Sequence, residues 1–304
     1  MRAPAHPTGP PPEPVRYAVV TPARNEECNL RRLADALVAQ TLPPSEWVVV
    51  DDASTDATPA ILAELAESYD WIRPLARPAA DASDRLADGR RKARDLDGFL
   101  YGAGSLSESG DVVVKVDADV DFDDAFFETL IGRFAADETL GIASGTCYEQ
   151  EAGEWVRRTK TEGSVWGATR AYRAQCLEDV MAMEPCMGWD GLDEIRAQLR
   201  GMSTQTFVDL AFRHHRPEGG RELSSLHQGE ALGRASWYMG YRPSYLALRT
   251  LYKARTEPAA LAMLWGYAAA AARRAPRCPD ERLVAEVRER QRLGATLRRG
   301  APVS

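Results

Sequence analysis

The chain has 304 residues, of which 44% are hydrophobic and 27% are charged, which is the composition of an ordinary globular protein. Its formal net charge of -7 at pH 7 argues against a nucleic-acid-binding protein, because such domains are usually basic. Five scattered cysteines without a C-x-x-C pair argue against a disulfide framework or a zinc site and are interpreted as reduced thiols. They are Cys28, Cys147, Cys176, Cys186 and Cys278.

Residues 1–15 form a proline-rich lead that is expected to be disordered and extended. The stretch MRAPAHPTGPPPEP holds six prolines and no apolar core, and it has the features of neither a signal peptide nor a membrane span. The later apolar stretch 258–272 is too short and too rich in alanine to be expected to cross a bilayer. The sequence therefore predicts a cytoplasmic protein and leaves a peripheral position at the inner membrane face open.

Strands and helices alternate from residue 16 onward. The strands are short apolar runs, and the helices have apolar residues at the spacing of one helical face. The run EWVVV is apolar almost throughout, which is typical of a parallel strand buried on both faces. The predicted elements are a strand over 16–21, a helix over 29–40, a strand over 46–50, a helix over 58–69 and a strand over 71–75.

A charged segment over 80–98 is predicted to form a loop and a helix before the strand VVVKV, which runs into the acidic segment 117–119. Alternating strands and helices with short links predict an α/β fold with a mostly parallel, Rossmann-like sheet flanked by helices. In such sheets ligands bind beyond the carboxyl ends of the strands. Three polar clusters follow strands, at 21–26, 51–56 and 117–119, so we expect them to converge on one rim.

The second half of the chain has fewer clear alternations. We predict a strand within 138–148, strands around a glycine-containing turn over 155–173, a helix over 188–201, a strand that runs into the histidine pair 214–215, and helices from residue 229 onward.

Asp117 and Asp119 are the strongest chemical signal in the chain. Residues i and i+2 at a strand end point to the same side, so two carboxylates can face one spot. Two oxygen donors suit a divalent cation such as Mg²⁺ or Mn²⁺, and phosphate oxygens fill its open positions well. The pair therefore predicts an enzyme that handles a diphosphate.

Five segments stand in a particular order and spacing. They are AVVTPARNEE (18–27), VVVDDASTDAT (48–58), VVVKVDADVDF (112–122), WGATRAYR (166–173) and GWDGLDEIRAQLRG (188–201). Together they resemble the family-2 glycosyltransferases with the GT-A fold. The resemblance implies metal-assisted, inverting transfer of a sugar from a nucleotide-diphosphate donor, with a UDP-sugar as the expected donor and guanosine or thymidine donors left open. It implies a catalytic domain over 16–216, with a nucleotide-binding half over 16–122 and an acceptor half over 123–216, and a helical extension over 217–304.

The resemblance also implies donor contacts. Asp52 would accept the N3–H of uracil, since a carboxylate only accepts hydrogen bonds. Asp51 is left open between a nucleotide contact and a turn-forming acid. The basic run with Arg90, Arg91 and Lys92 either pairs with diphosphate oxygens or forms a solvated helix face. The further residues implied in donor or substrate binding are Thr21, Pro22, Arg24, Glu26, Asp117, Trp166 and Trp189.

The metal ligands implied by the resemblance are acidic, with a histidine as a further candidate. Asp119 would bind the cation directly, and Asp117 would contact the ribose or a metal-bound water. His214 or His215 could add a ligand, but only one of two adjacent strand residues can face the site. A partly buried structural histidine is the alternative.

The catalytic base implied by the resemblance is Asp190, because Arg196 and Gly201 follow it at the family's spacing of six and eleven residues. Inversion requires a carboxylate that takes the acceptor hydroxyl proton. Trp189 replaces the family's usual Glu and could stack on a sugar ring or pack in the core. The acids that stay open as alternative bases are Asp193 and Glu194.

The C-terminal segment 271–300 holds nine arginines and four acids. Leu283, Val284 and Val287 form a modest apolar stripe, so a helix here could lie on an anionic membrane, or pack on its own domain or on a second subunit. The Gln-x-x-Arg-Trp motif of processive synthases is missing, which favours addition of a single sugar to a glycan, glycolipid or small natural product.

Two other functions compete with a glycosyltransferase. A sugar-1-phosphate nucleotidyltransferase would need a glycine-rich loop after the first strand, and the loop TPARNEE has no glycine. A non-catalytic nucleotide-sugar-binding protein would bind the nucleotide without turnover.

Overall fold

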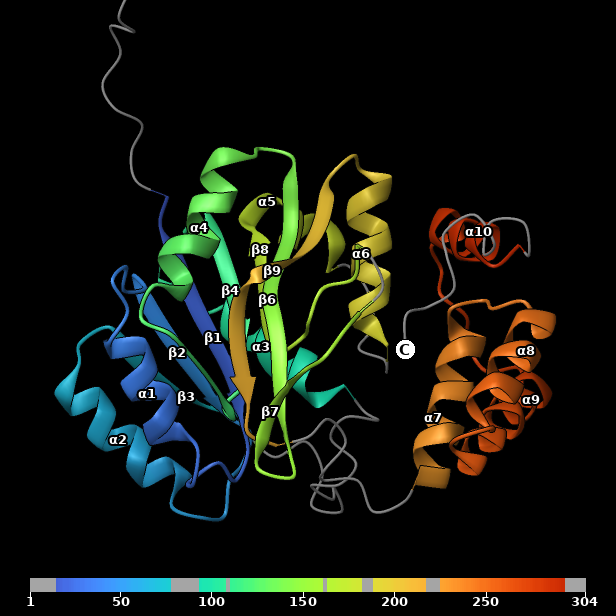
Figure 1. Cartoon of the computed structure of the whole chain (residues 1–304), viewed down its shortest axis with the longest axis horizontal. Helices are drawn as coiled ribbons and strands as arrows, with labels where there is room; N and C mark the ends of the chain where they lie inside the picture. Colours follow the sequence, from blue (N-terminus) through green and yellow to red (C-terminus); the bar gives the residue numbers. More distant parts are fainter. Residues whose placement is uncertain are drawn as a thin grey trace, which may run out of the picture.

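The computed structural model describes residues 15–77, 93–107, 110–160, 163–181, 188–216 and 225–292. In this part of the chain, nine strands form one mixed sheet that lies between two layers of helices, and further helices stand beside it (Figure 1). The strand order is β3-β2-β1-β4-β8-β6-β9-β5, with β7 paired to β6. The lead up to residue 14 and the basic run with Arg90, Arg91 and Lys92 lie outside the described residues.

The N-terminal half of the sheet is parallel, as the sequence predicts. β1 (Tyr17–Ala23) pairs with β2 (Glu46–Asp51) and with β4 (Val112–Val116), and β2 pairs with β3 (Ile72–Ala76). β4 is buried along its whole length because helices cover both of its faces. The carboxyl ends of these strands therefore lie along one edge.

The other half of the sheet is mixed. Beyond β4 comes the antiparallel strand β8 (Thr169–Arg173), followed by β6 (Leu140–Glu151), β9 (Ser203–His214) and β5 (Val120–Phe122). β6 and β9 run parallel, whereas β5 pairs with β9 in antiparallel register. This pairing brings the end of β9 next to the residues that follow the acidic pair.

The strands predicted over 155–173 are present, and each pairs with a strand outside that stretch. β7 (Glu154–Arg157) forms a hairpin with β6, and β8 pairs with β4 and β6 instead. The turn is made by Ala152 and Gly153, whose φ angles of 51° and 90° fit the two-residue turn that joins twisted strands.

Helices cover the two faces of the sheet with separate hydrophobic cores. Adjacent strand residues point to opposite faces, so Val114 packs in one core and Val113 in the other. One face carries α1 (Leu30–Val38), α2 (Thr58–Ser68) and α4 (Phe126–Ala136), and the other carries α3 (Arg94–Ala103), α5 (Ala174–Val180) and α6 (Trp189–Leu199). β5, α4 and α5 were not among the predicted elements.

The C-terminal helices pack on one another through glycines. The elements are α7 (Ser225–Tyr238), α8 (Pro243–Lys253), the 3-10 helix Pro258–Leu261, α9 (Ala262–Ala272) and α10 (Glu281–Arg290). A Cβ added at Gly233 of α7 would lie 2.1 Å from the carbonyl oxygen of Met263, and one at Gly266 of α9 would lie 2.1 Å from that of Glu230. The two helices can approach this closely only because these positions lack side chains.

The apolar stripe of α10 is buried inside the protein. Leu283 and Val287 pack with Leu192 of α6 and Met239 at the end of α7. Of the alternatives that the sequence left open for this helix, the structure shows packing on its own chain. No helix within the described ranges combines the length and the apolar character that a membrane crossing requires.

The close approach of α7 and α9 predicts opposite effects for two glycine substitutions. Gly233→Ala should lower the free energy of unfolding by about 1–3 kcal/mol, because the new methyl group forces the helices apart. Gly132→Ala in α4 should raise it by about 0.5–1 kcal/mol, because nothing lies within 4 Å of its added Cβ and alanine favours helix. Urea-induced unfolding measures both, and equal effects would contradict this packing.

Candidate active site

Three strand ends place acidic side chains along one edge of the sheet. Glu26 comes after β1, Asp52 after β2, and Asp117 and Asp119 after β4. Because β1 lies between β2 and β4 and is parallel to both, these ends are neighbours.

Asp117, Asp119 and His214 form a compact group of side chains that could hold a metal ion. One ligand atom from each lies within 4.8 Å of the other two. Nε2 of His214 is 3.2 Å from Oδ1 of Asp119. Two carboxylates with one imidazole form a mixed oxygen and nitrogen donor set that suits a cation such as Mn²⁺. We call this group the acidic cluster.

The charges of the acidic cluster depend on one another. Burial raises the pKa of Asp117 more than the neighbouring Lys115 ammonium lowers it, and the charge of Asp119 raises it further. Burial acts to lower the pKa of His214, but the hydrogen bond to Asp119 and the charges of both aspartates raise it to about 10. The pKa of Asp119 is lowered, because His214 and Arg216 outweigh the effect of burial. A cation would relieve the carboxylate repulsion and replace the imidazole proton, so these residues fit a metal.

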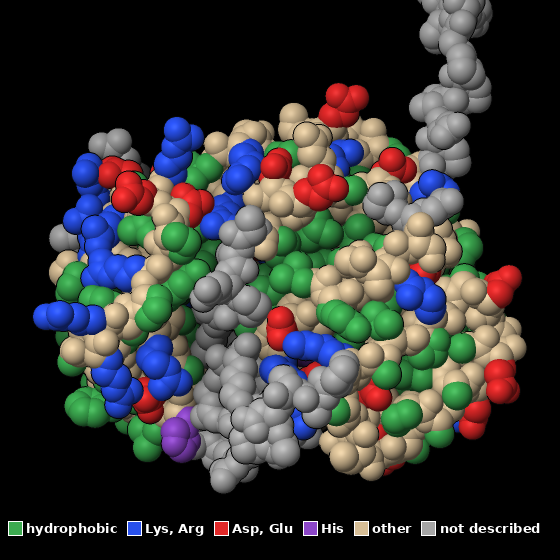
Figure 2. Space-filling model, turned by 180° about the vertical axis from the view of Figure 1, so that it is seen from behind, with side chains coloured by type: hydrophobic (Ala, Val, Ile, Leu, Met, Phe, Trp, Pro, Cys, Tyr) green, Lys and Arg blue, Asp and Glu red, His purple; other side chains and the backbone are tan. Residues whose placement is uncertain are grey.

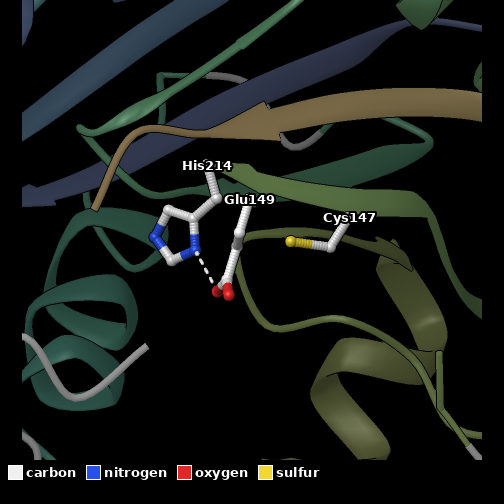
Figure 3. Close-up of side chains that lie close together, drawn as sticks. All are labelled: Cys147, Glu149 and His214. Carbon is white, nitrogen blue, oxygen red and sulfur yellow. Dashed lines mark ion pairs between the residues drawn. The ribbon is translucent and has the colours of Figure 1, made fainter. Parts of the chain in front are cut away.

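The two adjacent histidines contact different partners. Nδ1 of His214 lies 3.6 Å from Oε1 of Glu149, and Figure 3 shows these side chains turned toward each other with Cys147 beside Glu149. A carboxylate on the second ring nitrogen is the arrangement that orients metal-bound histidines. Nε2 of His215 instead lies 2.5 Å from Oδ2 of Asp121. Among the described residues, His214 is therefore the histidine that joins the acidic cluster.

Two cations hold the acids in position. Nη1 of Arg216 is 3.2 Å from Oδ2 of Asp119, and its Nη2 is 2.9 Å from Oε2 of Glu26. Lys115, whose side chain is 1% exposed, contacts Asp117. Arg216 therefore connects the ends of β1 and β4, and Lys115 fixes the first acid of the pair.

Asp52 is held by a bidentate ion pair. Nε of Arg94 donates to Oδ2 of Asp52 at 3.0 Å and Nη2 donates to Oδ1 at 2.8 Å, and Arg24 and Arg77 each come within 4.0 Å of this carboxylate. Such two-pronged contacts fix the orientation of a carboxylate more firmly than a single bond does. Arg94 follows Lys92 by two positions, so it lies just beyond the basic residues that the sequence left open as contacts for the diphosphate.

Other predicted donor residues lie at the same strand ends with defined partners. Thr21 is fully buried, and its hydroxyl accepts a hydrogen bond of 2.9 Å from the indole N–H of Trp47. Pro22 lies beside Gly98 of α3, where an added Cβ would be 3.1 Å from it. Oδ1 of Asp51 accepts a hydrogen bond from the backbone N–H three residues later, which is the turn-forming arrangement.

A buried network fixes the start of α6. Arg170 of β8 is 0% exposed and donates hydrogen bonds of 2.7 and 2.9 Å to the two oxygens of Asp193. It also donates to the backbone carbonyl of Asp190 at 2.8 Å and to Oε1 of Glu194 at 3.1 Å. Tyr172 donates a further bond of 2.6 Å to Asp193. Asp193 is thus buried with both oxygens engaged, which makes it unsuited to contact an acceptor.

Asp190 is the more accessible acid at this end of α6. Its side chain is 39% exposed, and Oδ2 lies 3.7 Å from Nζ of Lys160. The preceding Trp189 is buried, and the cationic groups of Lys115 and Arg170 lie 5.9 and 5.7 Å from its ring centroid. Lys115 therefore lies between the acidic cluster and the ring of Trp189, which directly precedes Asp190 in the chain.

A cavity of about 680 Å³ lies between α6 and the C-terminal helices. Asp190 and Glu194 line it from α6, and Tyr245 lines it from α8. Lys160 lines it as well, with its Nζ 4.7 Å from the ring centroid of the half-buried Trp166. The volume lies within the range of small-molecule sites. We call it the α6–α8 cavity.

Several residues of this site were not predicted from the sequence. Lys115 could have been identified from the sequence, because a charged residue inside the apolar strand VVVKV needs a partner when it is buried. Arg216 directly follows the histidine pair and Glu149 lies on a neighbouring strand, but only the pairing of β6, β9 and β5 brings them to the acids.

The sheet topology and the flanking helices define a GT-A fold. Residues 18–102 match the family model for glycosyl transferase family 2, which confirms the resemblance over that segment. Among solved structures, the chain is similar to the mannosyltransferase PcManGT from Pyrobaculum calidifontis in complex with GDP-Man and Mn²⁺. The superposed region covers 93% of this chain and 84% of the PcManGT chain. The TM-score is 0.54 at 20% identity.

Two further relatives are similar over shorter stretches. TarS residues 1–349 from S. aureus, in complex with UDP-GlcNAc, cover 72% of this chain and 64% of their own, with a TM-score of 0.54 at 18% identity. The beta-monoglucosyldiacylglycerol synthase of Nostoc sp. (strain PCC 7120) is 42% identical over 64 residues, which are 20% of this chain and 14% of that protein. The probable glycosyltransferase YdaM of Bacillus subtilis (strain 168) is 32% identical over 106 residues. These residues are 34% of this chain and 23% of that protein. The chain thus matches less than a quarter of each of these two curated relatives.

The acidic cluster predicts a specific metal dependence. Asp119→Asn should weaken Mn²⁺ binding at least about tenfold, because it removes a ligand carboxylate. Asp123→Asn is the matched control, since the Asp123 side chain is 80% exposed and pairs with Arg213. Calorimetric titration of both variants with Mn²⁺ measures the difference, and equal affinities would exclude Asp119 as a ligand.

The buried Glu194 predicts a pH dependence of stability. Burial raises its pKa from 4.5 to about 7 despite the neighbouring Arg170. Between pH 4.5 and 7 the folded protein keeps a proton that the unfolded chain releases, so the free energy of unfolding should fall as pH rises. Relative to Glu194→Gln, the parent should lose stability over this range. The exposed Glu67→Gln serves as control, and parallel curves for the parent and Glu194→Gln would refute the raised pKa.

Proposed function

We propose that the protein is a glycosyltransferase that moves one sugar from a nucleotide-diphosphate sugar, with UDP as the nucleotide, to an acceptor hydroxyl with inversion. The observation that carries this proposal is the acidic cluster at the carboxyl end of β4 in a GT-A sheet, linked through Lys115 and Trp189 to Asp190. The family-2 match over residues 18–102 and the nucleotide-sugar complexes of PcManGT and TarS support it.

The donor would bind along the rim formed by the ends of β1, β2 and β4. Asp52 would accept the N3–H of the uracil, and the bidentate contact with Arg94 holds its carboxylate ready for that bond. Arg24 lies close to the same carboxylate. The pre-orientation lowers the entropic cost of binding the base.

Asp117, Asp119 and His214 would hold the divalent cation, for which we propose Mn²⁺. When bound, the cation offsets negative charge on the departing nucleoside diphosphate. Lys115 and Arg216 keep the two carboxylates in position and add positive charge beside the diphosphate. Glu149 holds the His214 ring in the orientation that faces Asp119.

Asp190 would be the general base. Inversion requires attack from the face opposite the leaving diphosphate, with a carboxylate accepting the hydroxyl proton. Asp190 faces the α6–α8 cavity, where an acceptor can reach it. Glu194 also lines that cavity, but its pKa of about 7 makes it a less complete base at neutral pH, and its Oε1 already accepts bonds from Val165 and Arg170.

The variant Asp190→Asn tests the assignment of the base. It should slow sugar transfer by about 10²–10⁴-fold while leaving the affinity for UDP with Mn²⁺ unchanged, because only proton acceptance is lost. UDP release from a panel of nucleotide sugars measures turnover, and calorimetry measures binding.

The control for this experiment is Asp209→Asn, which is the same chemical change at an exposed acid of β9 that pairs with Arg133 and does not line the α6–α8 cavity. Near-normal turnover of Asp190→Asn would rule out Asp190 as the base. UDP binding without any release by the parent protein would favour the non-catalytic nucleotide-sugar-binding alternative.

A further inference from the structure

The α6–α8 cavity has an excess of positive charge on its walls. Its acidic lining residues are Asp190 and Glu194, and its basic lining residues are Lys160, Arg249, Lys253 and Arg290. Figure 2 shows lysine and arginine side chains gathered over the part of the molecule that the C-terminal helices form. In a chain with a net charge of -7, such a local excess calls for a physical explanation.

One face of α8 supplies two of these four basic residues. Tyr245, Arg249 and Lys253 follow one another at intervals of four residues, so they lie on the same side of the helix and all three line the cavity. They extend over about 12 Å of helix, since the rise is about 1.5 Å per residue. The ring of Tyr241, 5.9 Å from the guanidinium carbon of Arg249, lines the cavity beside them.

The cations of the cavity differ in how they are paired. Lys160 pairs with Asp190 at 3.7 Å, and Arg290 pairs with Glu286 at 2.8 Å. Within the part of the chain that the structure describes, no carboxylate lies within ion-pair distance of Arg249 or Lys253. These two half-buried cations therefore face the cavity with donors available for a ligand.

Two like charges four residues apart destabilise a helix, and an anion between them removes that repulsion. The guanidinium of Arg249 can present two parallel N–H groups, and the ammonium of Lys253 adds a point charge. This combination matches a phosphate group, which carries close to two negative charges and three acceptor oxygens at neutral pH.

We infer that the acceptor of the sugar carries a phosphate group, which Arg249 and Lys253 bind while the acceptor hydroxyl lies at Asp190. The inference rests on the proposed function, since it names the class of acceptor for the same site. The cavity contains both ends of this arrangement, and Tyr241 and Tyr245 offer aromatic surface for the part of the acceptor between them. The phosphate can belong to a soluble phosphorylated molecule or to a lipid headgroup.

The test uses inorganic phosphate as the probe, without metal, on the 304-residue chain. Arg249→Gln/Lys253→Gln should weaken phosphate binding at least about tenfold in calorimetric titration, because two charge-assisted contacts are lost. The control variant Arg255→Gln/Arg273→Gln removes the same charge from exposed positions outside the cavity and should bind phosphate like the parent. Equal phosphate affinity in all three proteins overturns the inference.

A second measurement separates this inference from the proposed function. UDP binding with Mn²⁺ should be the same in the parent and in both double variants, because the donor residues lie at the sheet rim. Absence of UDP binding in the parent contradicts the proposed function. Loss of UDP binding in Arg249→Gln/Lys253→Gln alone shows that the cavity serves the donor, and this also overturns the inference.

Two experiments distinguish a soluble phosphorylated acceptor from a lipid headgroup. Displacement of inorganic phosphate by glycerol 3-phosphate supports a soluble acceptor. Sedimentation of the parent and the control variant, but not of Arg249→Gln/Lys253→Gln, with vesicles of phosphatidic acid in phosphatidylcholine supports a lipid acceptor. The absence of both results, displacement by glycerol 3-phosphate and sedimentation with the vesicles, overturns the inference.

Discussion

The buried guanidinium of Arg170 is the constraint on which the geometry of the candidate active site depends. It joins β8 to the first turn of α6 by contacts to Asp193, Glu194 and the backbone of Asp190. Removing one partner from a buried ion pair costs about 3–5 kcal/mol, because the other charge is left unpaired. The network therefore holds α6 in one position relative to the sheet, and with it the exposed carboxylate of Asp190.

A second set of charges ties that helix to the acidic cluster. Lys115 contacts Asp117 and faces the ring of Trp189, while Arg216 joins Asp119 to Glu26. Each carboxylate at the rim is thus held by a cation before any ligand arrives. Polar groups that are already oriented need little reorganisation when charge develops during a reaction, which is the main source of electrostatic catalysis.

The sequence was sufficient to predict the parallel half of the fold and the strand ends that carry the acids. Apolar runs such as EWVVV and VVVKV report burial on two faces, and this signal depends only on local residues. The mixed half of the sheet was harder to predict, because the pairing of β7 and β8 depends on residues that are distant in the sequence. For the same reason the sequence pointed to Asp119, Asp190 and one of the adjacent histidines 214 and 215, but missed Arg170 and Arg216. The α6–α8 cavity could not be foreseen, since Arg249 and Lys253 reach it only through the packing of the C-terminal helices on α6.

The central claim is that one cation and one nucleoside diphosphate occupy the rim beside the start of α6. A crystal structure of the protein with UDP and Mn²⁺, with anomalous diffraction recorded at the manganese edge, tests this most directly. The account predicts one anomalous peak coordinated by Asp119 and His214 and by diphosphate oxygens, with the uracil at Asp52 and Asp190 facing the open side. A manganese peak elsewhere, or a diphosphate bound between Arg249 and Lys253, would contradict it.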